Sequence, residues 1–288
     1  MTRAVTIDLE QGWALLLEVR RIVRALQTPP AGLEIGFADT GPLLKITGNG
    51  VWSAGPPIST AAAELLDLYL PIALACRARP CTVAHLGQSL DGRIATLNGA
   101  SCHINGPENL THLHRMRALC DAIIVGASTV ECDNPQLTTR RVTGPHPARV
   151  ILDPRRRLSA EYRLFDDGAA PTLLVCAEAL TDEPALGQAQ VIGAPVYGSR
   201  LRLADVVRCL HARGLFGLFV EGGGLTVSAF LEAGLLERLH ITIAPLIIGS
   251  GRPGLTLPTI ADLSQGLRPA HRRYAMGEDV LFDCRLRD

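Results

Sequence analysis

Three consecutive glycines, Gly222, Gly223 and Gly224, follow an apolar segment (215–220) and precede a helical pattern that begins near Thr226. Glycines at a strand-to-helix turn let backbone N–H groups approach a phosphate, and a helix N-terminus favours negative charge. The alternative is a tight turn that simply needs small residues. Neither GxGxxG nor the P-loop pattern is present. Because three glycines exceed what a turn needs, the sequence favours a cradle for the diphosphate of a dinucleotide.

Glu221 directly precedes this triglycine corner and stands at the end of a buried strand. Its carboxylate is expected to point into the same cleft. It could hydrogen-bond a substrate there, or it could only pair with an arginine.

A second polar stretch follows the apolar segment that ends in Gly126. Hydroxyls at Ser128 and Thr129 and the carboxylate of Asp133 suit sugar and phosphate recognition, and Arg140 suits a bidentate phosphate clamp. An Asn-Pro pair after the aspartate forces a turn, and turn chemistry is the alternative explanation.

A third stretch, residues 88–95, follows the first strand of the same region. Ser89 and Asp91 could bond the loop backbone or a ligand, and a structural turn is at least as good an interpretation.

Together the motifs Ser-Leu-Asp-Gly-Arg-Ile-Ala, Asp-Ala-Ile-Ile-Val-Gly, Asp-Asn-Pro-Gln-Leu-Thr-Thr-Arg, Val-Glu-Gly-Gly-Gly and Ile-Ala-Pro-Leu-Ile-Ile-Gly-Ser-Gly resemble the riboflavin-biosynthesis reductase family. This family comprises the reductase half of the bacterial deaminase–reductase and its stand-alone relatives. The resemblance covers residues 79–288. It implies a dihydrofolate-reductase-like fold, NADPH as hydride donor, a homodimer, and a phosphorylated aminopyrimidine whose ribosylamino group is reduced to ribitylamino.

The resemblance also implies residue roles. Positions that match cofactor contacts are Gly87, His103, Thr129, Asp133, Pro154, Gly222, Gly223, Gly224 and Leu225. Positions that match substrate contacts are Ser101, Arg117, Leu137, Arg140 and Glu221. Of these, Arg117 and Arg140 suit the substrate phosphate, and Thr129 and Asp133 suit ribose hydroxyls. Glu221 and His85 are the expected catalytic residues: Glu221 orients the pyrimidine, and His85 assists a proton or binds a hydroxyl.

The chain departs from the family pattern at two histidines. His85 stands where many relatives carry a lysine, and it is expected to be a shorter donor that titrates near neutrality. His103 stands where an aromatic residue commonly covers the cofactor. The zinc deaminase signature is absent from the sequence. These differences leave open another aminopyrimidine or a pterin-like compound as the substrate.

Two further groups of charged or metal-binding residue types have weaker interpretations. Arg155, Arg156 and Arg157 could face the 2′-phosphate of NADPH or form a solvated basic loop. His112 and His114 are two residues apart and cannot share a helix face, so no metal site is predicted.

The elements that must position these residues alternate from residue 80 onward. Apolar segments predict strands at 81–86, 122–125, 149–152, 172–176, 215–220, 240–244 and 280–286. Helical patterns lie at 107–119, 203–213 and 226–235. We therefore expect an α/β fold: a mixed, mainly parallel sheet with helices on both faces and an antiparallel edge formed by the last two strands. Ligands of such sheets bind at the carboxyl ends of the strands.

Residues 1–76 have a different texture and predict a small α+β module. A helical pattern covers 9–26, β-like segments cover 33–37, 43–47 and 51–53, and a helix capped by Ser59 or Thr60 runs to about residue 75. Asn49-Gly50 predicts a hairpin turn. No cluster in this helix–hairpin–helix module suggests chemistry.

Composition limits the partners. The 28 basic and 28 acidic residues cancel, which argues against nucleic acid or an anionic membrane as the main partner. The 8 cysteines are scattered singly without CxxC spacing, and no apolar run is long enough to span a bilayer. We expect a cytoplasmic enzyme.

Two other functions fit the same scaffold. One is a dihydropterin or dihydrofolate reductase, which would act on unphosphorylated pterins. The other is a non-catalytic nucleotide sensor or partner subunit, which would bind NADPH without oxidising it.

Overall fold

The computed structural model describes residues 6–26, 32–37, 41–101 and 104–287. They form two compact units that divide between Cys81 and Thr82. Within the described part of the chain, no helix is both long and apolar enough to cross a membrane.

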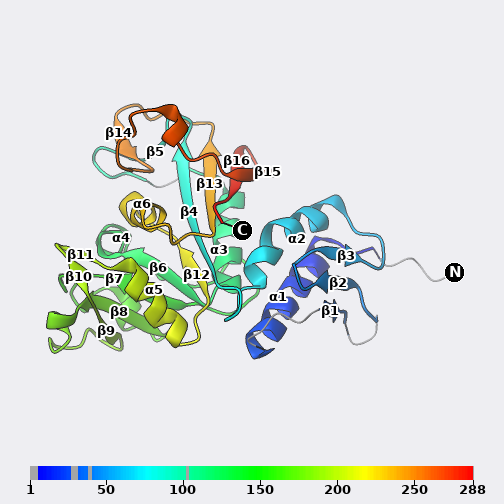
Figure 1. Cartoon of the computed structure of the whole chain (residues 1–288), viewed down its shortest axis with the longest axis horizontal. Helices are drawn as coiled ribbons and strands as arrows, with labels where there is room; N and C mark the ends of the chain where they lie inside the picture. Colours follow the sequence, from blue (N-terminus) through cyan, green and yellow to red (C-terminus); the bar gives the residue numbers. More distant parts are fainter. Residues whose placement is uncertain (1–5, 27–31, 38–40, 102–103, 288) are drawn as a thin grey trace. The chain divides into compact units, whose positions relative to one another are not determined.

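The first unit consists of two helices and a three-stranded antiparallel sheet (Figure 1). Its elements are α1 (Leu9–Leu26), β1 (Gly32–Ile35), β2 (Leu44–Thr47), β3 (Trp52–Ala54) and α2 (Thr60–Ala73). Ser59 caps α2 by accepting a hydrogen bond from Ala62 N. Trp13 of α1 meets Tyr69 of α2 edge-on, and Arg20 donates to Ala75 O at 2.5 Å. The helix predicted at 9–26 is confirmed, and the helix predicted to reach residue 75 ends at Ala73.

The second unit is built on a nine-stranded sheet. Its strands stand in the order β15-β16-β13-β4-β12-β6-β7-β8-β9. They are β4 (Cys81–Ser89), β6 (Ala122–Gly126), β7 (Ala148–Leu152), β8 (Thr172–Ala177), β9 (Gln190–Ala194), β12 (Gly217–Val220), β13 (Arg238–Ala244), β15 (Ala270–Met276) and β16 (Asp279–Arg285). Pairing is parallel between β13 and β4 and from β12 through β6, β7 and β8 to β9, and antiparallel at β16 and β15. The predicted mixed, mainly parallel sheet with an antiparallel edge is confirmed.

Helices cover both faces of this sheet (Figure 1). They are α3 (Pro107–Leu119), α4 (Ala127–Asp133), α5 (Leu203–Ala212) and α6 (Gly224–Glu232), with short 3₁₀ turns at Arg163–Phe165, Glu178–Leu180 and Leu263–Gln265. Leu86 of β4 shares one apolar cluster with Val206 of α5 and Phe230 of α6. His85, the next residue along β4, faces the other way and contacts Asn109 of α3.

Several elements have no counterpart in the predictions from sequence. They are α4, the central-sheet strands β9 and β15, and the short strands β5 (Arg93–Thr96), β10 (Val196–Tyr197), β11 (Arg200–Leu201) and β14 (Gly251–Pro253). The last four form two small antiparallel pairs outside the central sheet. Helix α6 begins at Gly224, two residues before the predicted start.

Candidate active site

A cavity of about 1210 Å³ opens where β4, β12, β6 and β7 end. These strands are neighbours in the sheet, so their carboxyl ends lie at one edge. Ligand cavities are typically 300–1,000 Å³, so this one has room for a dinucleotide with a second small molecule. The walls carry most of the residues that the sequence singled out. The predicted positions on the walls are His85, Gly87, Ser101, Thr129, Asp133, Leu137, Pro154, Glu221, Gly222, Gly223, Gly224 and Leu225.

The triglycine corner joins β12 to α6 and forms part of the cavity wall. Gly223 has φ +64°, a conformation that side chains rarely adopt. A Cβ on Gly224 would meet Gly254 O at 2.4 Å, whereas a Cβ on Gly222 would first meet Thr129 at 3.6 Å. Gly223 is the N-cap of α6 and offers no side chain to the first N–H groups of the helix. The corner therefore presents backbone donors at a helix N-terminus to the cavity, which suits a phosphate.

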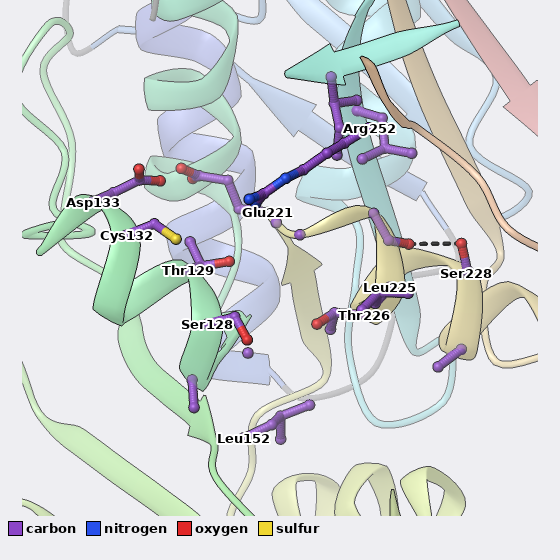
Figure 2. A pocket seen from close by; sticks show the side chains of 18 of the residues that line it. Ser128, Thr129, Cys132, Asp133, Leu152, Glu221, Leu225, Thr226, Ser228 and Arg252 are labelled. Atoms are coloured by element: carbon purple, nitrogen blue, oxygen red, sulfur yellow. Dashed lines mark hydrogen bonds between the residues drawn. The ribbon is translucent and has the colours of Figure 1, made fainter. Parts of the chain in front are cut away.

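Helix α4, which was not predicted from the sequence, lies next to the triglycine corner. Figure 2 shows both sides of the cavity with Glu221 between them: Ser128, Thr129, Cys132 and Asp133 on α4, and Leu225, Thr226 and Ser228 on α6. A Cβ added at Gly223 would lie 3.2 Å from Thr129 Oγ1, so this hydroxyl lies directly beside the triglycine corner. Burial raises the pKa of Asp133. Hydroxyl and carboxylate oxygens beside a phosphate cradle suit the hydroxyls of a ribose.

Glu221 is paired with Arg117, as one of its two predicted alternatives requires. Arg117 Nε donates to Glu221 Oε2 at 2.6 Å, and Nη2 donates to Oε1. Arg117 Nη1 donates to Thr138 O at 3.0 Å. The structure thus directs the guanidinium of Arg117 at Glu221 and a backbone carbonyl, and it places only Glu221 on the cavity wall.

Leu137 and Arg140 follow α4 and differ in position. Leu137 lines the cavity with a left-handed backbone, φ +58°, which is strained for a bulky residue. Arg140 is exposed and lies outside the cavity lining. Its Nη1 donates to Thr138 Oγ1 at 2.8 Å, and its backbone N–H donates to His114 Nδ1. Burial, and then the neighbouring Arg117, lower the pKa of Arg140.

His85 lies on the cavity wall but is only 4% exposed. Burial, and then His240, lower its pKa to about 3. The expectation that His85 titrates near neutrality is therefore wrong, because the sequence could not reveal how completely α3 covers this ring. His103 lies outside the described residues.

Gly87 allows the side chain of Asn105 to approach closely: a Cβ there would fall 1.9 Å from Asn105 Oδ1, so Asn105 would have to move. The third polar stretch is a structural turn. Ser89 Oγ donates to Asp91 Oδ1 at 2.6 Å, and Asp91 accepts hydrogen bonds from Ile248 N and Gly249 N. Neither Ser89 nor Asp91 lines the cavity.

Arginines supply the positive charge of the cavity wall. Arg155 and Arg157 line it, whereas Arg156 turns away and donates to the carbonyls of Leu180 and Pro184. Arg157 Nη2 donates to Ser128 Oγ at 2.7 Å and pairs with Glu131.

Reasoning from sequence missed several polar residues on the wall, among them Asn105, Asn109, Arg200 and Arg252. Arg252 directly follows the Gly-Ser-Gly of the last family motif, which could have singled it out. Its side chain reaches into the cavity (Figure 2). Asn105 lies in a loop, Asn109 in α3 and Arg200 in the short strand β11, and none of them stands beside a family motif.

Comparison with known proteins agrees with this geometry. Residues 80–271 match the family model of the RibD C-terminal domain. The 2,5-diamino-6-ribosylamino-4(3H)-pyrimidinone 5′-phosphate reductase of Methanothermobacter thermautotrophicus is 34% identical over 213 residues, which are 71% of this chain and 97% of that protein. The riboflavin biosynthesis protein RibD of Aquifex aeolicus is 33% identical over 206 residues, 71% of this chain and 57% of that longer protein.

The fold has a solved counterpart. The crystal structure of the diaminohydroxyphosphoribosylaminopyrimidine deaminase/5-amino-6-(5-phosphoribosylamino)uracil reductase of Thermotoga maritima superposes with a TM-score of 0.58 at 25% identity, over 80% of this chain and 64% of that one. The matched family model and the 34% identical relative confirm the resemblance that the motifs indicated, and the chain belongs to the RibD C-terminal domain family of riboflavin-biosynthesis reductases.

Proposed function

We propose that this protein is an NADPH-dependent reductase that converts the ribosylamino group of a phosphorylated aminopyrimidine to a ribitylamino group. The observation that carries the proposal is the cavity at the carboxyl ends of β4, β12, β6 and β7. It brings a glycine phosphate cradle and a paired carboxylate together in a chain whose relative is named as a reductase of such a compound.

The cavity fits a nicotinamide dinucleotide at its glycine corner. The close approach of Gly224 to Gly254 O leaves backbone N–H groups, and no side chain, facing the expected diphosphate. In the proposal Thr129 and Asp133 hold ribose hydroxyls of the dinucleotide. Gly87, Pro154 and Leu225 line the rest of the dinucleotide site. When bound, the reduced nicotinamide supplies the hydride.

Arg155 and Arg157 favour NADPH over NADH. A 2′-phosphate adds a dianionic group that guanidinium forks bind well. Arg157 is already fixed by Ser128 and Glu131, so little of its side-chain freedom remains to be lost on binding. Of the two earlier alternatives, a phosphate contact suits Arg155 and Arg157, whereas Arg156 fits neither, because its guanidinium donates to the carbonyls of Leu180 and Pro184.

The substrate is proposed to lie against Glu221, Leu137 and Ser101. Glu221, held by both prongs of Arg117, is an acceptor for the amino groups of a pyrimidine. Arg140 is free to turn its guanidinium toward the substrate phosphate, because only its Nη1 is engaged by the described side chains. Fixing the substrate at both ends would place the imine-like carbon of the opened ribosylamine against the hydride donor.

Nucleotide titration tests the cofactor assignment. Changing both Arg155 and Arg157 to alanine should weaken NADPH binding by about 10- to 100-fold, as expected for losing charge-assisted hydrogen bonds, and should leave NADH binding nearly unchanged. The matched control is Arg208→Ala, an exposed arginine of α5 outside the cavity. Equal losses for NADPH and NADH would overturn the 2′-phosphate assignment, and failure of the parent protein to bind either would overturn the function.

We further propose that the enzyme acts in the cytoplasm as a homodimer, with reduction confined to residues 79–288 and residues 1–76 forming a separate module. The 7 cysteines described by the structure are all free thiols, which suits a reducing compartment. Light scattering on the purified protein should give the mass of two chains, and a single-chain mass would contradict the dimer.

A further inference from the structure

Three buried polar residues form a row across the sheet behind the cavity wall. His85 of β4 stands opposite His240 of β13, and His240 stands opposite Asp283 of β16. His112 of α3 covers the row, with its ring centroid 5.3 Å from that of His85 and 5.1 Å from that of His240. Each of the four side chains is at most 4% exposed. Of this row, only His85 reaches the cavity.

Contacts within the row fix the orientation of each ring. His240 Nε2 lies 3.2 Å from Asp283 Oδ1, and His240 Nδ1 lies 3.2 Å from His112 Nε2. Asp283 also pairs with Arg238. The row is thus anchored at one end by a carboxylate, and His85 is its far end.

The hydrogen bonds of His85 decide which of its nitrogens carries the proton. Its Nε2 lies 3.0 Å from both Asn109 Oδ1 and Thr242 Oγ1. Thr242 Oγ1 donates its own proton to Asn109 Oδ1 at 2.8 Å. Because the amide oxygen only accepts and the threonine proton is already used, Nε2 must be the donor. Nδ1 is then the bare nitrogen, and within the described residues it has no hydrogen-bond partner.

The surroundings keep this ring neutral. Burial first, and then His240, lower the pKa of His85 to about 3. The pKa of His112, which faces His85 from α3, is also lowered well below its usual value, first by burial and then by His240 and His85. Asp283 lies beyond His240 and is compensated by Arg238. No carboxylate within the row pairs directly with His85.

We infer that His85 presents Nδ1 to the cavity as a hydrogen-bond acceptor for an amine or hydroxyl of the bound substrate, and that Asn109 and Thr242 are positioning residues that hold it in that tautomer. The inference rests on the proposed function for the class of ligand. It excludes two roles for this position. A neutral ring with a bare nitrogen neither delivers a proton nor attracts a phosphate, as a lysine would. The site therefore selects a substrate that offers an N–H or O–H group at this point.

The first test is the tautomer itself. In protein labelled with ¹⁵N in histidine, the ring nitrogen shifts and their couplings to ring protons report which nitrogen is protonated. We expect His85 to show a protonated Nε2 and a bare Nδ1, unchanged from pH 8 to pH 5, and the spectrum of His85→Gln assigns its signals. A protonated Nδ1, or titration within that range, would overturn the inference.

The second test separates the two nitrogens chemically. Glutamine places its amide near the position of Nε2, whereas asparagine places its amide near that of Nδ1. His85→Gln should therefore raise KM about 5- to 100-fold, the loss expected for an unpaired substrate donor, and His85→Asn should raise it less. His271→Gln, on the exposed edge strand β15, is the control and should match the parent. If KM rose more in His85→Asn than in His85→Gln, only the contact at Nε2 would matter, and the inference would be contradicted.

A third variant tests the positioning role. Asn109→Asp replaces the neutral acceptor by a carboxylate, which raises the pKa of a histidine that donates to it. KM should then become pH-dependent between pH 5 and 8, whereas the parent's KM should show no titration of His85 there. An unchanged pH profile would contradict the role of Asn109. The tautomer measurement needs no nucleotide or substrate, so it can fail while NADPH binding succeeds, and it can succeed if the reductase proposal fails.

Discussion

Arg117 and Glu221 form a two-pronged ion pair that joins the last turn of α3 to the end of β12. Their side chains are only 9% and 12% exposed. The pair holds the carboxylate of Glu221 on the cavity wall, and Arg117, which does not line the cavity, compensates its charge. An exposed carboxylate would move with its own rotamers, whereas this one is held in a single orientation.

Removing one partner of this pair should destabilise the fold. Arg117→Met leaves Glu221 charged and largely buried, and should lower the free energy of unfolding by about 3–5 kcal/mol in urea titrations. The double variant Arg117→Met/Glu221→Leu should recover most of that loss, since no charge is left unpaired. Neither variant should retain turnover, because both lose the oriented carboxylate. Additive losses of stability in the double variant would show that the pair is not coupled.

The glycine corner offers a matched pair of substitutions. Gly224→Ala should lower the melting temperature, because its Cβ would clash with Gly254 O at 2.4 Å and a clash in a packed site costs about 1–3 kcal/mol. Gly222→Ala has ordinary clearance, with the nearest atom at 3.6 Å, and should keep the parent's melting temperature. It should nevertheless weaken NADPH binding in a fluorescence titration, because the methyl group stands where the diphosphate approaches. Unchanged NADPH affinity in Gly222→Ala would remove the diphosphate from this corner.

Acid should unfold the protein through its neutral histidines. The pKa of His85 is about 3 in the folded state and near 6.5 when unfolded, so between these values the unfolded chain binds one more proton. Stability contributed by the neutral ring is therefore present above pH 6.5 and is lost as pH falls, at about 1.4 kcal/mol per pH unit for one histidine. His85→Asn should reduce the slope of unfolding free energy against pH between pH 6 and 4 by that amount. An identical slope in both proteins would show that His85 titrates normally.

Protonation of Asp283 should also lower the free energy of unfolding, but at lower pH than protonation of His85. Burial would raise the pKa of Asp283, but the contacts with His240 and Arg238 outweigh burial and lower the pKa to about 2. Its stabilising contribution is thus present above the unfolded value near 3.8 and is lost as pH falls toward 2. Relative to the parent, Asp283→Asn should cost about 2 kcal/mol at pH 7, and this difference should shrink below pH 4. Urea unfolding at several pH values measures it. A difference that is constant down to pH 3 would mean that His240 and Arg238 do not lower this pKa.

The sequence predicted the scaffold well for a physical reason. Strands such as 122–125 and 150–152 are continuously apolar because they are buried on both faces, and the helix at 107–119 begins after a glycine with proline in its first turn. The glycine corner and the polar ends of neighbouring strands also follow from local sequence, because parallel strands bring their carboxyl ends to one edge.

Other features depend on contacts between distant residues. Helix α4 is only 7 residues long and rich in serine, threonine and acidic residues, so its local preference for a helix is weak. The partner of Glu221 lies 104 positions away, and the row from His85 to Asp283 joins three strands and a helix. Whether a histidine is neutral depends on burial by such distant elements, which no local pattern encodes.

The most direct test of the reductase assignment is turnover. The purified protein would be mixed with NADPH and 2,5-diamino-6-ribosylamino-4(3H)-pyrimidinone 5′-phosphate, the compound in the name of the Methanothermobacter relative, and loss of the nicotinamide absorbance followed. We predict substrate-dependent oxidation of NADPH with a ribitylamino product, and none with an unphosphorylated dihydropterin. Binding of NADPH without oxidation would identify a sensor instead, and oxidation driven only by the dihydropterin would contradict the assigned substrate class.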